Sequence, residues 1–148
     1  MKTLATIFAA TICLTAPAQT VSQPSTLDPQ LAVRAIIGEA AGEPFTTKLA
    51  IAAALRNRDS LVGVRGLRNA RMIDAQPARV WADARCAWSE SATNDLTHSA
   101  AYFESTNFPT PYWARGMKPT ATVGVFRFWK LNPPVMQSKY RARSSVPG

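Results

Sequence analysis

Glu39 is the side chain best suited to proton transfer in the segment AIIGEAAGEPFTTKLAIAAALRNR, residues 35–58. It lies near the carboxyl end of an expected apolar helix, one turn after Ala35 and Ile36, and helical side chains lean back toward the preceding turn. Such surroundings partly desolvate a carboxyl group, which favours its neutral acid form. Glu39 is therefore a candidate to donate a proton near neutral pH.

A second carboxylate, Glu43, lies four residues later and is expected on the same side of the helix. Two like charges at this spacing raise the proton affinity of one of them. The alternative interpretation is that both glutamates are solvated residues on an amphipathic helix. The pattern alone makes Glu39 a candidate and does not decide between the two interpretations.

Cys86 and His98 are the residues available for thiol chemistry, as nucleophile and base of an endopeptidase. Against this hypothesis, Cys86 falls inside an expected helix, whereas activated cysteines favour helix starts. His98 is interpreted as a surface loop residue. Because these are the only His and Cys beyond residue 15, a metal site built from several such ligands is nearly excluded, and we expect no metal and no other cofactor.

Helices are expected to position these residues in the first part of the chain. Asp28 is a good N-cap, Pro29 suits the first helical position, and Gly42 ends this helix. Thr46 or Thr47 is expected to cap the next helix. The expected helices cover residues 28–41, 46–58 and 77–91, with an irregular connection at residues 59–76.

Beyond Asn94 the pattern changes from helical to extended. A short strand is expected at residues 100–104, and a loop rich in proline and aromatic residues at 108–116. Residues 122–130 alternate as a half-buried strand, with Arg127 on one face and aromatic residues on the other. Helices followed by a small sheet predict an α+β domain.

The two ends of the chain are expected to lie outside the folded domain. Residues 1–18 have the features of a secretory signal peptide: Met1-Lys2, an apolar stretch, and Ala16-Pro17-Ala18 as a cleavage site. A retained membrane anchor is the alternative, but a spanning helix needs about 18 or more apolar residues. We expect a signal peptide at 1–18, a linker at 19–27, the folded domain at 28–131 and a basic, flexible tail at 132–148.

The charge balance predicts an anionic partner. The chain has 17 Lys plus Arg against 9 Asp plus Glu, a formal charge of +8. Lys2 is the only charged residue that removal of the signal peptide would take away. The mature chain would keep Cys86 alone, so no internal disulfide is possible. The arginine-rich stretch 56–71 has no interleaved aromatic residues and no nucleic-acid-binding signature. We therefore expect attraction to the cell envelope and no nucleic-acid partner.

A family resemblance rests mainly on residues 35–58. This block contains Gly38-Glu39-Ala40, Gly42-Glu43-Pro44, Lys48, residues 50–53 and Asn57-Arg58. The later blocks are the helix at 81–91, Asn94-Asp95-x-Thr97, Ala100-x-Tyr102-Phe103, Pro111, Trp113, and residues 122–128, which look like a terminal hairpin. Over about residues 30 to 130, the chain resembles the SleB-type cell wall hydrolase family of spore cortex-lytic enzymes.

The resemblance implies a small lysozyme-like or lytic-transglycosylase-like domain, mainly helical in its amino-terminal part, with a short antiparallel sheet near the carboxyl terminus. It implies cleavage of the β-1,4 glycosidic bond between N-acetylmuramic acid and N-acetylglucosamine in peptidoglycan. The Glu of the family's Gly-Glu-Ala element is the catalytic acid, and Glu39 matches it. Glu39 would protonate the glycosidic oxygen and then accept a proton from water or from the muramic 6-hydroxyl.

Four further residues are predicted to contact substrate. Attack by water normally needs a second carboxylate, and the candidates are Glu43 and Asp95, whereas attack by the 6-hydroxyl needs one carboxylate only. Trp113 could stack on a sugar, because flat ring faces suit pyranose CH groups, and Tyr102 could form a wall of the sugar cleft. Core packing is the alternative for both aromatic residues.

The expected partners are peptidoglycan glycan strands and the anionic cell envelope. The protein is expected to be a monomer that is secreted or located in the periplasm or cell envelope. Two other functions remain open at this stage. One is a peptidoglycan endopeptidase using Cys86 and His98. The other is an envelope-binding module that has kept the fold and lost the chemistry.

Overall fold

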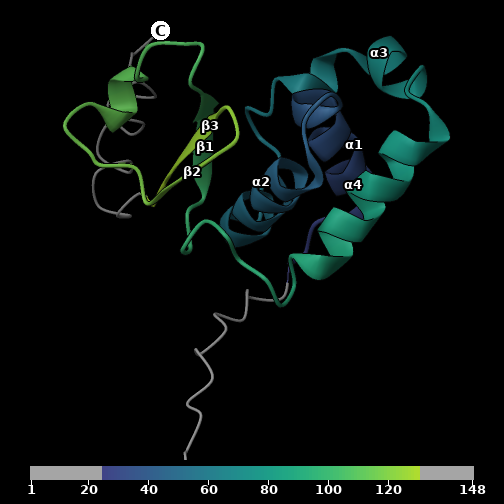
Figure 1. The fold of residues 1–148 in the computed structure, drawn as a ribbon, viewed down its shortest axis with the longest axis horizontal. Helices are drawn as coiled ribbons and strands as arrows, with labels where there is room; N and C mark the ends of the chain where they lie inside the picture. Colours follow the sequence, from purple (N-terminus) through teal and green to yellow (C-terminus); the bar gives the residue numbers. More distant parts are fainter. Residues whose placement is uncertain (1–24, 131–148) are drawn as a thin grey trace, which may run out of the picture.

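The computed structural model describes residues 25–130, which form a group of helices with a small sheet at one side (Figure 1). The expected signal peptide, most of the linker and the basic tail lie outside the described residues. At the end of the linker, Ser25 and Thr26 bind Asp59: the Thr26 N–H and the Ser25 hydroxyl donate to its carboxylate at 2.7 and 2.8 Å. Hydrogen bonds from Thr26 and Ser25 lower the pKa of Asp59. None of the helices within residues 25–130 has the length and hydrophobicity of a membrane span.

Helix α1, Pro29–Ala40, begins as its sequence predicts. The Asp28 side chain accepts a hydrogen bond from the Leu31 N–H at 2.9 Å, and Pro29 occupies the first turn, where a missing N–H leaves no partner unsatisfied. The cap explains why the helix starts here, and the prediction for this element is confirmed.

Helix α2, Phe45–Arg58, begins differently from the prediction. Pro44 precedes its first turn and no side chain caps it, so the expected threonine cap is wrong. Thr47 is buried inside the helix instead, and its hydroxyl has no hydrogen-bond partner among the described residues. The helix ends at Arg58, and the next residue, Asp59, adopts a left-handed conformation with φ 49°.

The segment expected to be irregular contains two short helices, η1, Gly66–Arg68, and α3, Ala70–Asp74. The Asn69 side chain caps α3 by accepting from the Met72 N–H at 3.1 Å. Helix α4, Ala78–Glu90, follows and agrees with the predicted third helix. The expectation of a wholly irregular connection is therefore wrong, because asparagine provides a local helix start there.

The sheet has three antiparallel strands in the order β1-β3-β2: β1, Tyr102–Ser105, β2, Ala121–Val123, and β3, Phe126–Trp129. The single strand expected at residues 122–130 is wrong. Gly124, with φ 56°, turns the chain so that Val123 pairs with Phe126. The terminal hairpin implied by the family resemblance is present, and the α+β class with a short sheet near the carboxyl terminus is confirmed.

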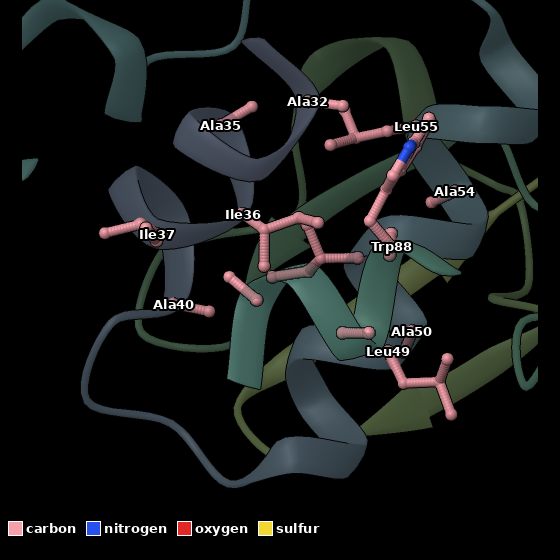
Figure 2. Packing of buried hydrophobic residues seen from close by; sticks show 14 of the residues in the cluster. Ala32, Ala35, Ile36, Ile37, Ala40, Leu49, Ala50, Ala54, Leu55 and Trp88 are labelled. Atoms are coloured by element: carbon pink, nitrogen blue, oxygen red, sulfur yellow. The ribbon is translucent and has the colours of Figure 1, made fainter. Parts of the chain in front are cut away.

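The hydrophobic core lies among α1, α2 and α4 (Figure 2). Ile36 and Leu55 are fully buried, and each such side chain contributes about 1.5–3 kcal/mol. Helix α2 is buried without interruption over residues 47–55, and its alanines allow close approach of the elements around it. Phe126 and Phe128 of β3 belong to the same core. The sheet is thereby packed on the helices, and α2 contacts both β1 and β2.

Candidate active site

A cavity of about 600 Å³ lies between the end of α1, the loop after α2 and strand β1. It is lined by both carboxylates and guanidinium groups as well as aromatic rings, and the residues are Glu39, Arg58, Ser60, Val62, Gly63, Val64, Arg65, Tyr102, Phe103, Glu104, Trp113 and Phe126. Three of the five predicted site residues, Glu39, Tyr102 and Trp113, therefore share one cavity. Apolar and aromatic side chains combined with a few charged groups are typical of clefts that bind small ligands.

The carboxylate of Glu39 is held by the backbone of η1. The Gly66 N–H donates a hydrogen bond to Glu39 Oε1 at 2.7 Å. Only one carboxylate oxygen takes part in this bond, so the other remains available to a ligand in the cavity. The partly buried side chain at the end of α1 matches the surroundings expected for it.

Two glycines make this hydrogen bond possible. A Cβ placed on Gly38 would lie 2.5 Å from the carbonyl carbon of Gly66, and a Cβ on Gly66 would in turn overlap the backbone of Gly38. The backbones of α1 and η1 therefore cross at a distance that excludes any side chain at either position. Because Gly38 directly precedes Glu39, the crossing fixes the Gly66 N–H opposite the carboxylate.

Tyr102 and Trp113 form an aromatic wall of the cavity. Their ring centroids lie 5.7 Å apart, and Trp113 packs edge-on against Trp129 at 5.4 Å. Trp113 is half-buried, so it is packed by protein on one side and lines the cavity on another. The two interpretations of these rings, core packing and cleft wall, are thus compatible in this fold.

Glu43 is not a helical neighbour of Glu39. Helix α1 ends at Ala40, and the Glu43 N–H donates to the Ala40 carbonyl in the following turn. The Glu43 carbonyl accepts from Lys48 Nζ at 2.6 Å, which ties this turn to α2. The expected placement on one helical side is therefore wrong, because the helix stops first. Glu43 does not line the cavity, and its contact with substrate stays a prediction.

Asp95 organises the loop that leads into β1. It accepts hydrogen bonds from the Thr97 N–H and hydroxyl, from the Ser99 N–H and from Asn57 Nδ2, at 2.6 to 3.0 Å. Partial burial acts to raise the pKa of Asp95, but the hydrogen bonds from Thr97, Asn57 and Ser99 outweigh it and hold the pKa below its usual value. Asp95 does not line the cavity, and its contact with substrate also stays a prediction.

Cys86 and His98 are both exposed and belong to different elements of the fold. Cys86 is exposed on α4, and His98 is exposed in the loop before β1, with φ 56°. No hydrogen bond joins them among the described residues, and neither lines the cavity. Within residues 25–130, no three His, Cys, Asp or Glu side chains are grouped to hold a metal ion.

The cavity contains charged residues that sequence reasoning did not assign to the site, Arg58, Arg65 and Glu104. A signal for Glu104 was present, since side chains two apart on a strand share a face and Glu104 follows Tyr102 at that spacing. Arg58 belongs to the Asn57-Arg58 block of the resemblance. Nothing in the local pattern distinguishes Arg65 from the other arginines of the stretch 56–71.

No protein-family model and no curated protein matches this chain. Two solved structures do. The crystal structure of the catalytic domain of the Bacillus cereus SleB protein aligns with a TM-score of 0.55 at 23% identity, covering 78% of this chain and 99% of that domain. The catalytic domain of the germination-specific lytic transglycosylase SleB from Bacillus anthracis aligns with a TM-score of 0.53 at 23% identity, covering 73% of this chain and 100% of that domain. The chain thus has the fold of a SleB catalytic domain, which confirms the resemblance at the level of the fold.

Proposed function

We propose that this chain is a peptidoglycan-lytic enzyme that cleaves the β-1,4 bond between N-acetylmuramic acid and N-acetylglucosamine. The observation that carries the proposal is the carboxylate of Glu39, fixed by the Gly66 N–H at 2.7 Å in the wall of a cavity of about 600 Å³. The likeness in fold to a domain described as a lytic transglycosylase supports the choice of substrate.

Glu39 acts first as an acid and then as a base. Its neutral carboxyl donates a proton to the glycosidic oxygen as the bond from C1 of the muramic acid to that oxygen breaks. The resulting carboxylate is stabilised by the Gly66 N–H. It then removes a proton from the nucleophile that attacks C1, which restores the neutral acid. A muramic 6-hydroxyl as nucleophile gives a 1,6-anhydro end, and water gives a reducing end.

The choice between these nucleophiles depends on a second carboxylate. Hydrolysis normally uses two carboxyl groups, whereas intramolecular attack by the 6-hydroxyl uses one. Glu104 fits the second role better than Glu43 or Asp95, because it lines the same cavity as Glu39. Its carboxylate forms no ion pair with any described residue.

The aromatic wall supports a sugar ligand. The Tyr102 and Trp113 rings lie 5.7 Å apart at an angle of 54°, and both line the cavity. Flat ring faces at such a wall pack against the CH groups of a pyranose. The enzyme acts outside the cytoplasm in this proposal, exported by residues 1–18 and attracted to the anionic envelope by its positive charge.

The test is muropeptide release from purified peptidoglycan by the chain without residues 1–18, analysed by mass spectrometry. We expect Glu39→Gln to lower the rate about a thousandfold, because it removes the acid and keeps the shape. Glu90→Gln on α4 is the matched control and keeps full activity, since Glu90 is exposed and outside the cavity.

Three results would overturn the proposal. Unchanged release by Glu39→Gln would remove Glu39 from the chemistry, and loss of activity in Cys86→Ala would indicate thiol chemistry instead. Binding of the chain to peptidoglycan without release of any fragment would identify a non-catalytic envelope module. Export is tested separately, by fusing residues 1–18 to a reporter that is active only outside the cytoplasm.

A further inference from the structure

The guanidinium of Arg58 is held in the cavity wall by stacking. Its Cζ lies 5.2 Å from the centroid of the Tyr102 ring. On the loop after α2, Gly63 brings its backbone beside the same group, since a Cβ built there would lie 3.7 Å from Arg58 Nη2. Stacking on a ring face orients the plane of a guanidinium and leaves the N–H groups along its edge available.

Neither Arg58 nor Arg65 is paired with a described residue. The ion pairs within residues 25–130 are Arg34 with Asp74 and Lys48 with Asp83. The guanidinium groups of Arg58 and Arg65 donate no hydrogen bond to another described residue. Both line the cavity together with Glu39 and Glu104, yet neither forms an ion pair with these carboxylates.

Other arginines of the chain show the contrast. Arg56 also stacks on an aromatic ring, that of Trp88, but it donates to the Trp88 carbonyl and the Ser91 hydroxyl. Arg127 donates to the Phe108 carbonyl at 2.7 Å. Arg56 thus holds the carboxyl end of α4, and Arg127 holds the loop after β1. The side-chain donors of Arg58 and Arg65, by contrast, have no partner among the described residues.

We propose that Arg58 and Arg65 form an anion subsite that binds a carboxylate of the peptide carried by the muramic acid. The inference rests on the proposed function. Arg65 directly precedes Gly66, whose N–H holds Glu39, so the subsite adjoins the acid that acts on the C1 bond of that sugar. The peptide is attached to the lactyl group of the same sugar and contains free carboxylates. A planar guanidinium binds a carboxylate through two parallel hydrogen bonds.

The experiment compares two substrates on the same variants. One is peptidoglycan with its peptide carboxylates free, and the other is the same preparation with those carboxylates converted to amides. We expect Arg58→Gln and Arg65→Gln each to raise KM for the free form about tenfold, with kcat within about twofold, and to change neither constant for the amidated form. Arg58→Lys keeps the charge but lacks the planar guanidinium. Its KM for the free form is therefore expected to lie between that of the wild type and that of Arg58→Gln.

Arg68→Gln is the matched control. Arg68 is exposed on η1, in the same basic stretch, and does not line the cavity. Arg68→Gln removes one positive charge, as Arg58→Gln and Arg65→Gln do. A weaker general attraction to the anionic substrate would therefore raise KM in this variant too. If Arg58 had a purely structural role, as a cation at the end of α2, Arg58→Gln would have a lower unfolding temperature. Its kinetic constants would then change equally for both substrates.

A binding measurement decides the proposal independently of catalysis. The Glu39→Gln variant is titrated by NMR with a soluble disaccharide-peptide carrying free carboxylates and with its amidated form. We expect about tenfold tighter binding of the free form, and loss of this preference when Arg58→Gln is added. Equal affinity for the two forms would overturn the subsite, even if the wild-type chain is active. A charge-dependent affinity in a wild-type chain that releases no muropeptides would instead overturn the proposed function and keep the subsite.

Discussion

The Gly66 N–H donates to Glu39 Oε1 at 2.7 Å across 27 positions of the sequence. The bond depends on the backbone crossing of Gly38 and Gly66, where neither position has space for a Cβ. The proton-transfer group is therefore positioned by two backbones in contact. A carboxylate held in this way keeps its orientation through the reaction, which is the condition for efficient proton transfer.

The crossing predicts that Gly66→Ala impairs both folding and catalysis. The added methyl group would push η1 away from α1, so we expect a loss of about 1–3 kcal/mol in the free energy of unfolding and a large fall in kcat. Gly42→Ala is the matched control, because a Cβ there meets nothing within 4 Å. Urea unfolding and muropeptide release measure the two effects. Wild-type stability in Gly66→Ala would show that the backbones are not in contact.

Asp95 predicts a specific dependence of stability on pH. Its pKa is lower in the folded chain than in the unfolded chain, so its stabilising contribution is present above the unfolded pKa and disappears as pH falls through the folded value. We expect Asp95→Asn to reduce the free energy of unfolding by about 1–3 kcal/mol at pH 7, with a smaller difference at pH 3. Asp74→Asn, which loses a surface ion pair with Arg34, should cost about 1 kcal/mol or less at pH 7. A difference for Asp95→Asn that stays constant with pH would contradict the assignment.

Glu104 predicts a change in the products rather than a complete loss of activity. If it assists water, Glu104→Gln lowers the yield of reducing ends and leaves the yield of 1,6-anhydro ends unchanged, because the 6-hydroxyl route needs Glu39 alone. Mass spectrometry of the released muropeptides distinguishes the two ends, which differ by one water. An equal fall in both products would instead indicate a role in binding the sugar. Glu90→Gln, which is exposed and outside the cavity, should leave the ratio of the two ends unchanged.

Trp113 predicts separate effects on binding and on stability. In Trp113→Ala the ring pairs with Tyr102 and Trp129 are lost, which should cost about 1–3 kcal/mol of unfolding free energy. We also expect KM for peptidoglycan to rise severalfold, because a wall of the cleft is removed. Trp81→Ala on α4 is the comparison, since Trp81 is partly buried but outside the cavity. It should lose stability with KM unchanged, and a KM change of similar size in both variants would make the effect on binding indirect.

Several elements are determined by the sequence alone because their causes are local. The Asp28 cap and Pro29 define the start of α1 within four residues, and the apolar period of α4 is sufficient to predict it. The hairpin at residues 121–129 shows the limit of such reasoning. The two-residue alternation of side chains continues across the turn. The left-handed conformation at Gly124 reverses the chain without interrupting this alternation, so the sequence pattern does not reveal the turn.

The site itself was decided by the tertiary structure. The sequence identified Glu39 through its helix and its resemblance, but the group that holds it comes from η1, and the arginine beside Tyr102 comes from α2. Spacing along one helix suggested Glu43 as the companion carboxylate, whereas the fold brings Glu104 of β1 into the cavity. Hydrogen bonding within a helix acts over four residues, so it specifies where a helix lies in the sequence. Which side chains meet across a cavity depends on how α1, α2 and the sheet pack on their shared core, and only the folded chain determines that packing.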